Sequence, residues 1–469
     1  MNAPTSLQDW IAAVDARSTR VAIIGLGYVG LPLALLFSET GFKVTGFDID
    51  EKKVNALNEG RSYIHRIEAA QIDAARSTGF TATTDFAALK ACDAILICVP
   101  TPLVGGPGEA HTPDMSFVTS TVEAIAPHTR PGHLIVLEST TWPGTTTELV
   151  VPTLERLGPT LVHRNEGPGP RVQGAENSSS SGPLALDPEP SLFVAFSPER
   201  EDPGNTITPR RAIPKVIGGI SAVAAQAAAA LYGTIFDRTV IVSSTEAAEM
   251  TKLLENIYRG VNIALVNELK QLCLAMGIDI WEVIDAASTK PFGFAPFYPG
   301  PGIGGHCIPV DPFYLSWRAR HFNQPTRFIE LAGEVNEAMP AFVVRTIERA
   351  LERDGKKLSE AKVLLLGIAY KRDVDDLRES PALTIFSLLE DAGAEVAYND
   401  PFFPTVGRGR KYKLETASTP LEQASEFDCV VLVTDHSAYD IPALVAASKL
   451  FVDTRNATRG LTSENIVRC

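Results

Sequence analysis

The sequence predicts an α/β protein with two doubly wound, Rossmann-like domains joined by a long helix and a helical middle domain. Three observations support this fold class. A β-branched strand near the N-terminus leads into a Gly-x-Gly-x-x-Gly turn and a helix. From about residue 356 the order of strands repeats, again with an acidic residue at the tip of the second strand. Between the copies lies a long amphipathic pattern, so we expect domains at residues 1–243, 244–355 and 356–469.

The first copy opens with a strand at residues 21–24 and a helix at residues 31–38. The turn between them holds three glycines at the spacing of a dinucleotide-binding fingerprint. Gly25 makes the turn, Gly27 lets the backbone approach a pyrophosphate, and Gly30 lets the helix pack closely on the strand. Because a strand precedes this turn and a helix follows it, we interpret it as a dinucleotide site rather than a Gly-rich turn of another kind.

The second strand, residues 43–47, ends at Asp48. A carboxylate there can accept hydrogen bonds from ribose hydroxyls and would repel a 2′-phosphate, so NAD is favoured over NADP. Apolar strands at residues 93–99 and 133–137 end in small polar residues, at the sheet edge where doubly wound folds bind ligands. We expect the following residues around the cofactor: Gly25, Gly27, Tyr28, Val29, Gly30, Asp48, Lys53, Pro100, Thr101 and Thr141.

The composition shifts to Gly, Pro, Asn, Glu and Ser at about residues 163–190, which indicates a solvated loop or a disordered insertion. A strand at residues 192–196 follows, and it leads into Ser-Pro-Glu-Arg with Glu199 and Arg200. A further strand at residues 240–242 precedes the long helix.

The long helix is predicted at residues 246–276 by an apolar stripe of 3.6-residue period. Lys252, Asn256 and Arg259 share one face because they are spaced by four and three residues. Such residues often form a solvated edge, but an asparagine between two cations suits an anion or oxyanion site. A helix of this length also suits a dimer seam. Further helices are predicted at residues 279–287 and 327–353.

A Gly/Pro-rich loop at residues 300–313 carries Cys307, with Asp311 four residues later. Glycines let a ligand touch main chain, and proline fixes the backbone path. The pattern indicates a cysteine nucleophile with a carboxylate in reach. The alternative is a turn with a buried, unreactive cysteine.

The second copy has strands at residues 362–367, 395–400, 428–433 and 450–453. It lacks the Gly-x-Gly-x-x-Gly fingerprint, and Gly-Ile-Ala-Tyr-Lys-Arg stands in its place. We therefore expect this domain to bind something other than a dinucleotide pyrophosphate.

The net charge of −14 argues against nucleic acid or an anionic membrane as a partner. The apolar runs are too short for a membrane span, and residues 1–20 lack the apolar segment of a signal peptide. The six cysteines have neither a disulfide framework nor zinc-ligand spacing, so we expect a cytoplasmic protein without a metal site.

From about residue 20 to residue 456 these motifs resemble the UDP-glucose/GDP-mannose dehydrogenases, NAD-dependent enzymes that oxidise the C6 alcohol of a nucleotide sugar to a carboxylate. The segment Pro-Phe-Tyr-Pro-Gly-Pro-Gly, followed by Gly-Gly-His-Cys-Ile-Pro-Val-Asp-Pro, is similar to the branch that acts on UDP-N-acetylhexosamines. The resemblance is greatest to the UDP-N-acetylglucosamine 6-dehydrogenases, with the UDP-N-acetylmannosamine enzymes as near relatives.

The resemblance implies a role for each matching residue. Cys307 matches the nucleophile, Lys252 and Asn256 the pair that stabilises oxyanions, and Asp311 a carboxylate for proton transfer. Glu199 and Thr141 match groups around the hydrolytic water, and Arg378 an NAD contact from the C-terminal domain. The residues implied for substrate binding are Glu199, Arg200, Lys252, Asn256, Arg259, Phe297, Tyr298, Gly300, Gly304, Tyr370 and Lys371.

Two features depart from the family pattern. The serine-rich segment is an insertion, and a second glutamate that some relatives carry falls here on Pro203. The implied reaction is a four-electron oxidation of UDP-N-acetylglucosamine through a cysteine thioester, which supplies surface polysaccharide precursors. We expect a homodimer or a higher homo-oligomer. UDP-N-acetylmannosamine and UDP-glucose are alternative substrates. A single-oxidation hydroxyacid dehydrogenase and a non-catalytic NAD sensor are alternatives of other classes.

Overall fold

The structure is a computed structural model that describes residues 6–64, 66–104, 112–164, 191–201, 208–305, 308–407 and 416–469. The chain packs as two compact units, Met1–Leu254 and Glu255–Cys469, and each is described by itself. Three predicted features lie outside the described residues: the nucleophile Cys307, Pro203, and the serine-rich insertion from residue 165 to residue 190. The boundaries of the three predicted domains stay a prediction.

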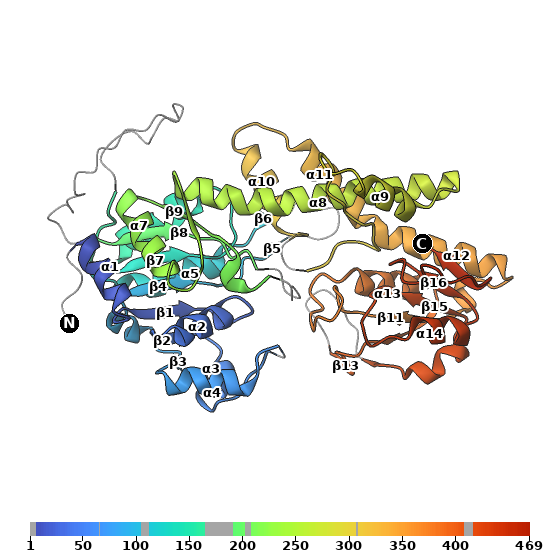
Figure 1. Cartoon of the computed structure of the whole chain (residues 1–469), viewed down its shortest axis with the longest axis horizontal. Helices are drawn as coiled ribbons and strands as arrows, with labels where there is room; N and C mark the ends of the chain where they lie inside the picture. The colour runs from blue at the N-terminus through green and yellow to red at the C-terminus, as the bar shows by residue number, and fades with distance from the viewer. Residues whose placement is uncertain are drawn as a thin grey trace. The chain divides into compact units, whose positions relative to one another are not determined.

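The first unit is built on an eight-stranded sheet in the order β10-β9-β8-β7-β4-β1-β2-β3 (Figure 1). Neighbouring strands are parallel except β8 and β9, which are antiparallel. The predicted strands are present, whereas β3 and β9 were not predicted. The strands are β1 Arg20–Ile24, β2 Lys43–Phe47, β3 Thr81–Thr83, β4 Ala94–Ile97, β7 Leu134–Leu137, β8 Phe193–Phe196, β9 Lys215–Gly219 and β10 Thr239–Val242.

Both faces of this sheet are buried at its central strands β1, β4, β7 and β8. Val21 and Ile23 of β1 belong to one core, and the alternating residues Ala22 and Ile24 are buried on the other face. The apolar runs of these strands follow from this two-sided burial. The helices of the unit are α1 Leu7–Asp15, α2 Gly30–Glu39, α3 Glu51–Asn58, α4 Ala69–Ser77, α5 Ser116–Ile125, α6 Val151–Leu157 and α7 Ala222–Tyr232. Shorter elements are the helical turns η1 Phe86–Ala91, η2 Ala126–His128, η3 Thr146–Val150 and η4 Arg210–Ala212, and the hairpin β5 Leu103–Val104 with β6 Thr112–Pro113.

The predicted long helix is α8, Thr245–Met276, with 32 residues. It is followed by α9, Ile280–Ser288, whose first turn is capped by the Asp279 carboxylate. The helix predicted at residues 327–353 is instead two helices, α11 Arg327–Glu337 and α12 Met339–Arg353, which meet at Ala338. The cause is Pro340, which has no N–H to continue the hydrogen-bond ladder of the preceding helix.

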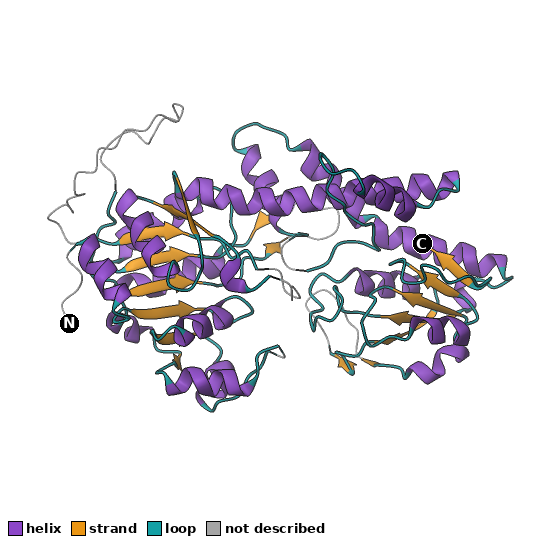
Figure 2. Ribbon diagram, viewed as in Figure 1, coloured by secondary structure: helices purple, strands orange, loops and turns teal. Residues whose placement is uncertain are grey.

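The second unit holds a five-stranded parallel sheet in the order β12-β11-β15-β16-β17, with helices beside it (Figure 2). The strand β17 was not predicted. The strands are β11 Lys362–Leu366, β12 Glu395–Asn399, β15 Cys429–Leu432, β16 Phe451–Asp453 and β17 Ile466–Arg468, and a hairpin is formed by β13 Thr405–Val406 and β14 Thr416–Ala417. The remaining helices and turns are α10 Asp311–Arg320, α13 Pro381–Asp391, α14 Ile441–Ala447, η5 Leu358–Glu360 and η6 Leu421–Glu426.

The two sheets repeat one local geometry at the end of their first strands. Gly25 N donates to Phe47 O at 2.8 Å, and Gly367 N donates to Asn399 O at 2.9 Å. Both glycines have positive φ, +89° and +80°, where a side chain would be strained. The repeat seen in the sequence is therefore a repeat of structure, and the predicted fold class is confirmed.

Within the described residues, none of the helices combines the length and the apolar character that crossing a bilayer would need.

Candidate active site

The glycine turn of the first unit is shaped for a dinucleotide. A Cβ on Gly25 would lie 2.7 Å from Cys98 O, and a Cβ on Gly30 only 1.9 Å from Gly25 O, so neither position tolerates a side chain. Gly27 faces open space instead, with no atom within 4 Å of the Cβ position. Backbone that is exposed in this way at the start of α2 can approach a pyrophosphate. The residues present therefore fit NAD.

Asp48 lies under the same turn and is almost fully buried. Its carboxylate accepts hydrogen bonds from Leu26 N at 2.9 Å, Asp50 N at 3.0 Å and Lys53 Nζ at 3.2 Å. An ionised carboxylate has about four acceptor positions, so a ribose hydroxyl can still be accommodated. The predicted neighbour Lys53 thus contacts Asp48 directly.

The matching acid of the second unit, Asp400, accepts four hydrogen bonds, one more than Asp48. It accepts hydrogen bonds from the backbone of Ile368, Ala369 and Phe402, at 2.8 to 2.9 Å. The fourth partner is His436 Nε2, at 3.2 Å. Because Asp373 N donates to His436 Nδ1, the ring proton is on Nε2 and points at Asp400. The second domain therefore keeps the acid but surrounds it with more donors from the protein than Asp48 has.

Other residues predicted around the cofactor lie on the same turn or at strand ends. Val29 precedes the first turn of α2, and Tyr28 O accepts a hydrogen bond from Arg66 at 3.1 Å. At the ends of β4 and β7, Thr101 Oγ1 donates to Thr140 O at 2.8 Å, which brings the loops of Thr101 and Thr141 together. Thr141 is buried, and Pro100 is exposed.

Glu199 follows β8 and lies near three cationic side chains of the first unit. Its Oε1 accepts from Arg200 N at 2.8 Å and Glu201 N at 2.7 Å, and its Oε2 lies 3.9 Å from Lys215 Nζ. Burial alone would raise the pKa of Glu199, but the charges of Lys215, Arg210 and Lys252 outweigh it and lower the pKa. Glu199 is therefore held as a carboxylate. Arg200 itself donates to Pro214 O at 2.7 Å.

The three residues predicted to share one face of α8 differ in burial. Lys252 and Asn256 are buried, whereas Arg259 is exposed. In the second unit Asn256 Nδ2 donates to Asp311 Oδ2 at 2.5 Å, and Asp311 is the first residue of α10. Pro312 suits the first turn of a helix, so the Cys307 loop changes into helix at the predicted carboxylate. This places Asn256 and Asp311 side by side.

The glycines before Cys307 pack against residues that were predicted to bind substrate. A Cβ on Gly304 would lie 2.5 Å from Tyr370 Cβ, and Gly305 N donates to Arg378 O at 2.9 Å. Gly300 N donates to Asn267 Oδ1 at 2.9 Å. The loop is therefore pressed onto the Gly-Ile-Ala-Tyr-Lys-Arg segment, and only glycine fits at residue 304.

Aromatic contacts and ion pairs hold the remaining predicted residues of the second unit. Phe297 packs edge-on against Tyr258, with ring centroids 5.6 Å apart, and Tyr298 stacks on Trp281 at 5.2 Å. Arg378 is bound bidentately by Asp376, with Nη2 2.7 Å from Oδ2. Lys371 is half-buried on the segment after β11.

Sequence reasoning missed several charged residues beside these sites. Lys215 and Glu138 flank Glu199 in the first unit, and Glu249 accepts hydrogen bonds from the loop after β7. In the second unit Arg455 Nη1 lies 2.9 Å from the Cβ position of Gly300. Lys215 follows a proline and Arg455 follows a strand, and neither belongs to a recognisable sequence motif. Only the packing of distant segments identifies these two residues.

Comparison with known proteins gives matches along most of the chain. Residues 19–236 match the NAD binding domain of the UDP-glucose/GDP-mannose dehydrogenase family, residues 246–338 its central domain, and residues 364–460 its UDP binding domain. The UDP-N-acetyl-D-mannosamine dehydrogenase of Methanococcus maripaludis is 32% identical over 455 residues, 94% of each chain. The enzyme of that name from Salmonella typhi is 34% identical over 453 residues, 94% of this chain and 99% of the relative.

Solved structures agree with these sequence matches. The UDP-D-ManNAc dehydrogenase of Pyrococcus horikoshii has a TM-score of 0.80 and 30% identity, and the match covers 96% of this chain and 99% of that one. The UDP-N-acetyl-mannosamine dehydrogenase of Staphylococcus aureus has a TM-score of 0.76 and 29% identity, with 96% and 97% covered. The chain therefore belongs to the UDP-glucose/GDP-mannose dehydrogenase family and is an NAD-dependent oxidoreductase of UDP-sugars.

Proposed function

We propose that this protein oxidises the C6 alcohol of a UDP-N-acetylhexosamine to the carboxylate in two steps, each of which reduces one NAD. The observation that carries the proposal is the buried Asn256–Asp311 pair at the point where the Cys307 loop becomes α10. In the sequence, Asp311 follows the thiol of Cys307 by four residues. An amide donor, a carboxylate and a thiol are the groups that an oxidation through a covalent intermediate requires.

UDP-N-acetyl-D-mannosamine is the substrate we favour. This choice is supported by the relatives from Methanococcus maripaludis and Salmonella typhi, which are UDP-N-acetyl-D-mannosamine dehydrogenases and match 94% of this chain. UDP-N-acetylglucosamine, which the sequence motifs favoured, stays the second candidate because the two sugars differ at one stereocentre. Tyr370 and Lys371, which lie after β11, are proposed to hold the UDP group.

NAD, when bound at the glycine turn, accepts hydride from the substrate carbon. The chain supplies the rest of the chemistry. Lys252 and Asn256 stabilise the developing alkoxide, and Asp311 receives a proton through water. Cys307 adds to the aldehyde as a thiolate to give a thiohemiacetal, which is oxidised to a thioester. Water activated by Glu199 then releases the acid and the free thiol.

A homodimer is the assembly we propose, with α8 as its seam. The C-terminal half of α8 exposes a row of large apolar side chains, among them Leu265 at 53%, Leu272 at 54% and Met276 at 61%. Apolar side chains repeated along one helix are the usual signature of a protein interface.

The five described cysteines are free thiols, which supports the cytoplasm as the compartment.

The test is the number of NADH molecules formed per sugar from UDP-N-acetylmannosamine, UDP-N-acetylglucosamine and UDP-glucose, each assayed separately. Two equivalents from the mannosamine substrate alone support the proposal in full. Two equivalents from another sugar correct the substrate, and one equivalent contradicts the covalent mechanism. The variant Cys307→Ala is expected to bind NAD and to form no acid.

A further inference from the structure

A buried ion-pair network in the first unit surrounds the turn that carries Glu199. Lys215, in β9, has its ammonium group buried among three acceptors. Its Nζ lies 2.7 Å from Glu138 Oε2, 3.1 Å from Pro198 O and 3.9 Å from Glu199 Oε2. Lys215 therefore contacts both the backbone before Glu199 and the Glu199 carboxylate.

Glu138, at the end of β7, holds Lys215 in this position. Its carboxylate is fully buried, and it accepts a second hydrogen bond from the hydroxyl of Tyr232 in α7. Lys215 Nζ also lies 5.1 Å from the Tyr232 ring centroid and 5.5 Å from that of Phe236. A lysine whose ammonium is paired and lies beside two aromatic rings has little freedom to move away from Glu199.

The Glu199 carboxylate has one oxygen left for chemistry. Oε1 is occupied by the two backbone N–H groups of Arg200 and Glu201. Oε2 faces Lys215 at 3.9 Å, which is too long for a hydrogen bond but short enough for a strong charge interaction in a buried site. A water molecule can therefore bind at Oε2 while the cation keeps the oxygen ionised.

We propose that Lys215 is a positioning residue for Glu199, and that Glu138 and Tyr232 serve to hold Lys215. This inference rests on the proposed function, in which Glu199 activates the water that hydrolyses the thioester. The groups that face Glu199 are Lys215 of β9, Arg210 of η4, Lys252 of α8 and Glu138 of β7, while Cys98 of β4 and Tyr232 of α7 face Glu138. Removing the Lys215 charge leaves Arg210 and Lys252 as the cations near Glu199 among the described residues.

The test uses full-length enzyme with paired substitutions. Lys215→Met alone would strand the buried Glu138 charge and risks misfolding. The double variant Lys215→Met/Glu138→Gln removes both charges, and its glutamine can still accept the Tyr232 hydrogen bond. Lys215→Arg restores the charge, and Lys43→Met, which changes an exposed lysine of β2, is the matched control.

We expect the double variant to bind NAD and to complete the first two hydride transfers at the normal rate. Steady-state turnover at neutral pH should fall about tenfold, and the acidic limb of the kcat–pH profile should move to higher pH, because Glu199 is then protonated more readily. KM should change little. Lys215→Arg should return the limb toward its normal position, and Lys43→Met should leave it unchanged.

An infrared titration of the Glu199 carboxyl, assigned by its loss in Glu199→Gln, gives a readout that needs no substrate. A titration midpoint that is the same in wild type and in a folded double variant would overturn the inference, as would a failure of Lys215→Arg to restore the pH profile. If wild-type enzyme forms no NADH from any UDP-sugar, the proposed function fails, and the infrared titration still decides whether Lys215 governs Glu199.

Discussion

Glu249 of α8 binds Thr146 twice: its Oε1 accepts a hydrogen bond from the Thr146 backbone at 2.9 Å and from the Thr146 hydroxyl at 2.7 Å. Gly144 N donates to the other oxygen at 2.6 Å. Burial nevertheless raises the pKa of Glu249 to about 7, because the hydrogen bonds do not fully offset desolvation. The carboxylate therefore ties the Thr141 loop to the helix that carries Lys252, at an energetic cost above neutral pH.

Glu249 should make stability fall as pH rises from about 4.3, the value of an unfolded glutamate, to about 7. In that window the unfolded chain has lost the proton and the folded chain still binds it. Across this window the unfolding free energy of wild type minus that of Glu249→Gln should decrease, by an amount on the order of 3 kcal/mol. Denaturant unfolding between pH 4 and pH 8 measures the difference.

Glu246, one turn earlier, is the control for this prediction. Burial raises its pKa, but hydrogen bonds from its own backbone and from Thr147 outweigh burial and lower it. Glu246→Gln should therefore leave the difference flat above about pH 5. A decrease of the same size for Glu246→Gln, or none for Glu249→Gln, would show that Glu249 does not carry the effect.

Gly27→Ala should weaken NAD binding without loss of stability. The Cβ of the alanine would meet no protein atom within 4 Å, so the fold should not be strained. It would occupy the space that the pyrophosphate approaches, so it should clash with bound NAD. We expect at least about a tenfold rise in the NAD dissociation constant, measured by fluorescence titration, and an unchanged melting temperature. Gly407→Ala, also in open space, is the matched control and should alter neither. Unaltered NAD affinity in Gly27→Ala would place the pyrophosphate elsewhere.

Asp48→Ser should lower NAD affinity and reduce the preference for NAD over NADP, because the serine no longer repels a 2′-phosphate.

Asp400 is the internal comparison, since it occupies the same place in the second sheet. Asp400→Asn should destabilise the protein by about 1–3 kcal/mol, because it disrupts four hydrogen bonds to a buried carboxylate, and should leave NAD affinity intact. Isothermal titration with both nucleotides separates these outcomes; lost NAD affinity in Asp400→Asn would refute the assignment.

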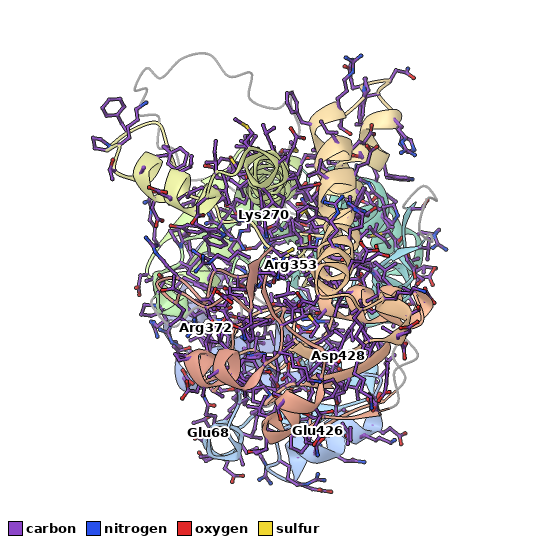
Figure 3. All side chains as sticks on the ribbon, turned by 90° about the vertical axis from the view of Figure 1, so that its right-hand side faces the viewer. Glu68, Lys270, Arg353, Arg372, Glu426 and Asp428 are labelled. Carbon is purple, nitrogen blue, oxygen red and sulfur yellow. The ribbon has the colours of Figure 1, made fainter. Side chains whose placement is uncertain are left out.

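Lys270 of α8 is labelled in Figure 3, and its burial should make it a net cost to stability. Its ammonium is buried, and it has no hydrogen-bond partner among the described residues. Burial lowers the pKa of Lys270, so the penalty is largest below that pKa and fades as pH rises toward about 10.4, the unfolded value. Lys270→Met should raise the unfolding free energy by about 1–3 kcal/mol at neutral pH.

Thermal melts of Lys270→Met at neutral and alkaline pH test this expectation, since the gain should shrink as pH rises. Lys449→Met removes an exposed lysine from the same unit and should change stability by no more than about 0.5 kcal/mol. A destabilised Lys270→Met would mean that the ammonium has a partner that stabilises it.

Local patterns in the sequence were sufficient for most of the fold. The 3.6-residue apolar period of α8 arises because one stripe of the helix is buried. The continuous apolar runs of β1, β4 and β7 arise because both faces of these strands are buried. Both patterns can be read directly from the sequence. The strands β3, β9 and β17 were missed because none of them has more than two consecutive apolar residues and no motif marks them. The break at Ala338 was missed although Pro340 signals it.

The candidate site was predictable only where its residues share an element or a motif. Lys252 and Asn256 are four residues apart on one helix, so their common face follows from helical geometry. Asn256 and Asp311 are 55 residues apart, and Glu138 and Lys215 are 77 apart. The members of each pair are brought together by the packing of separate strands and helices. Residue spacing in a single sequence does not reveal such contacts.

The paired turn glycines Gly25 and Gly367 point to a common ancestry for the two sheets. Copies that keep the same backbone hydrogen bond and the same acid at the next strand are what duplication of one nucleotide-binding half would leave. In the second sheet, His436 adds a fourth hydrogen bond to this acid, whereas Asp48 accepts three. A side chain at residue 436 that cannot donate would leave Asp400 with three hydrogen bonds, the number that Asp48 accepts.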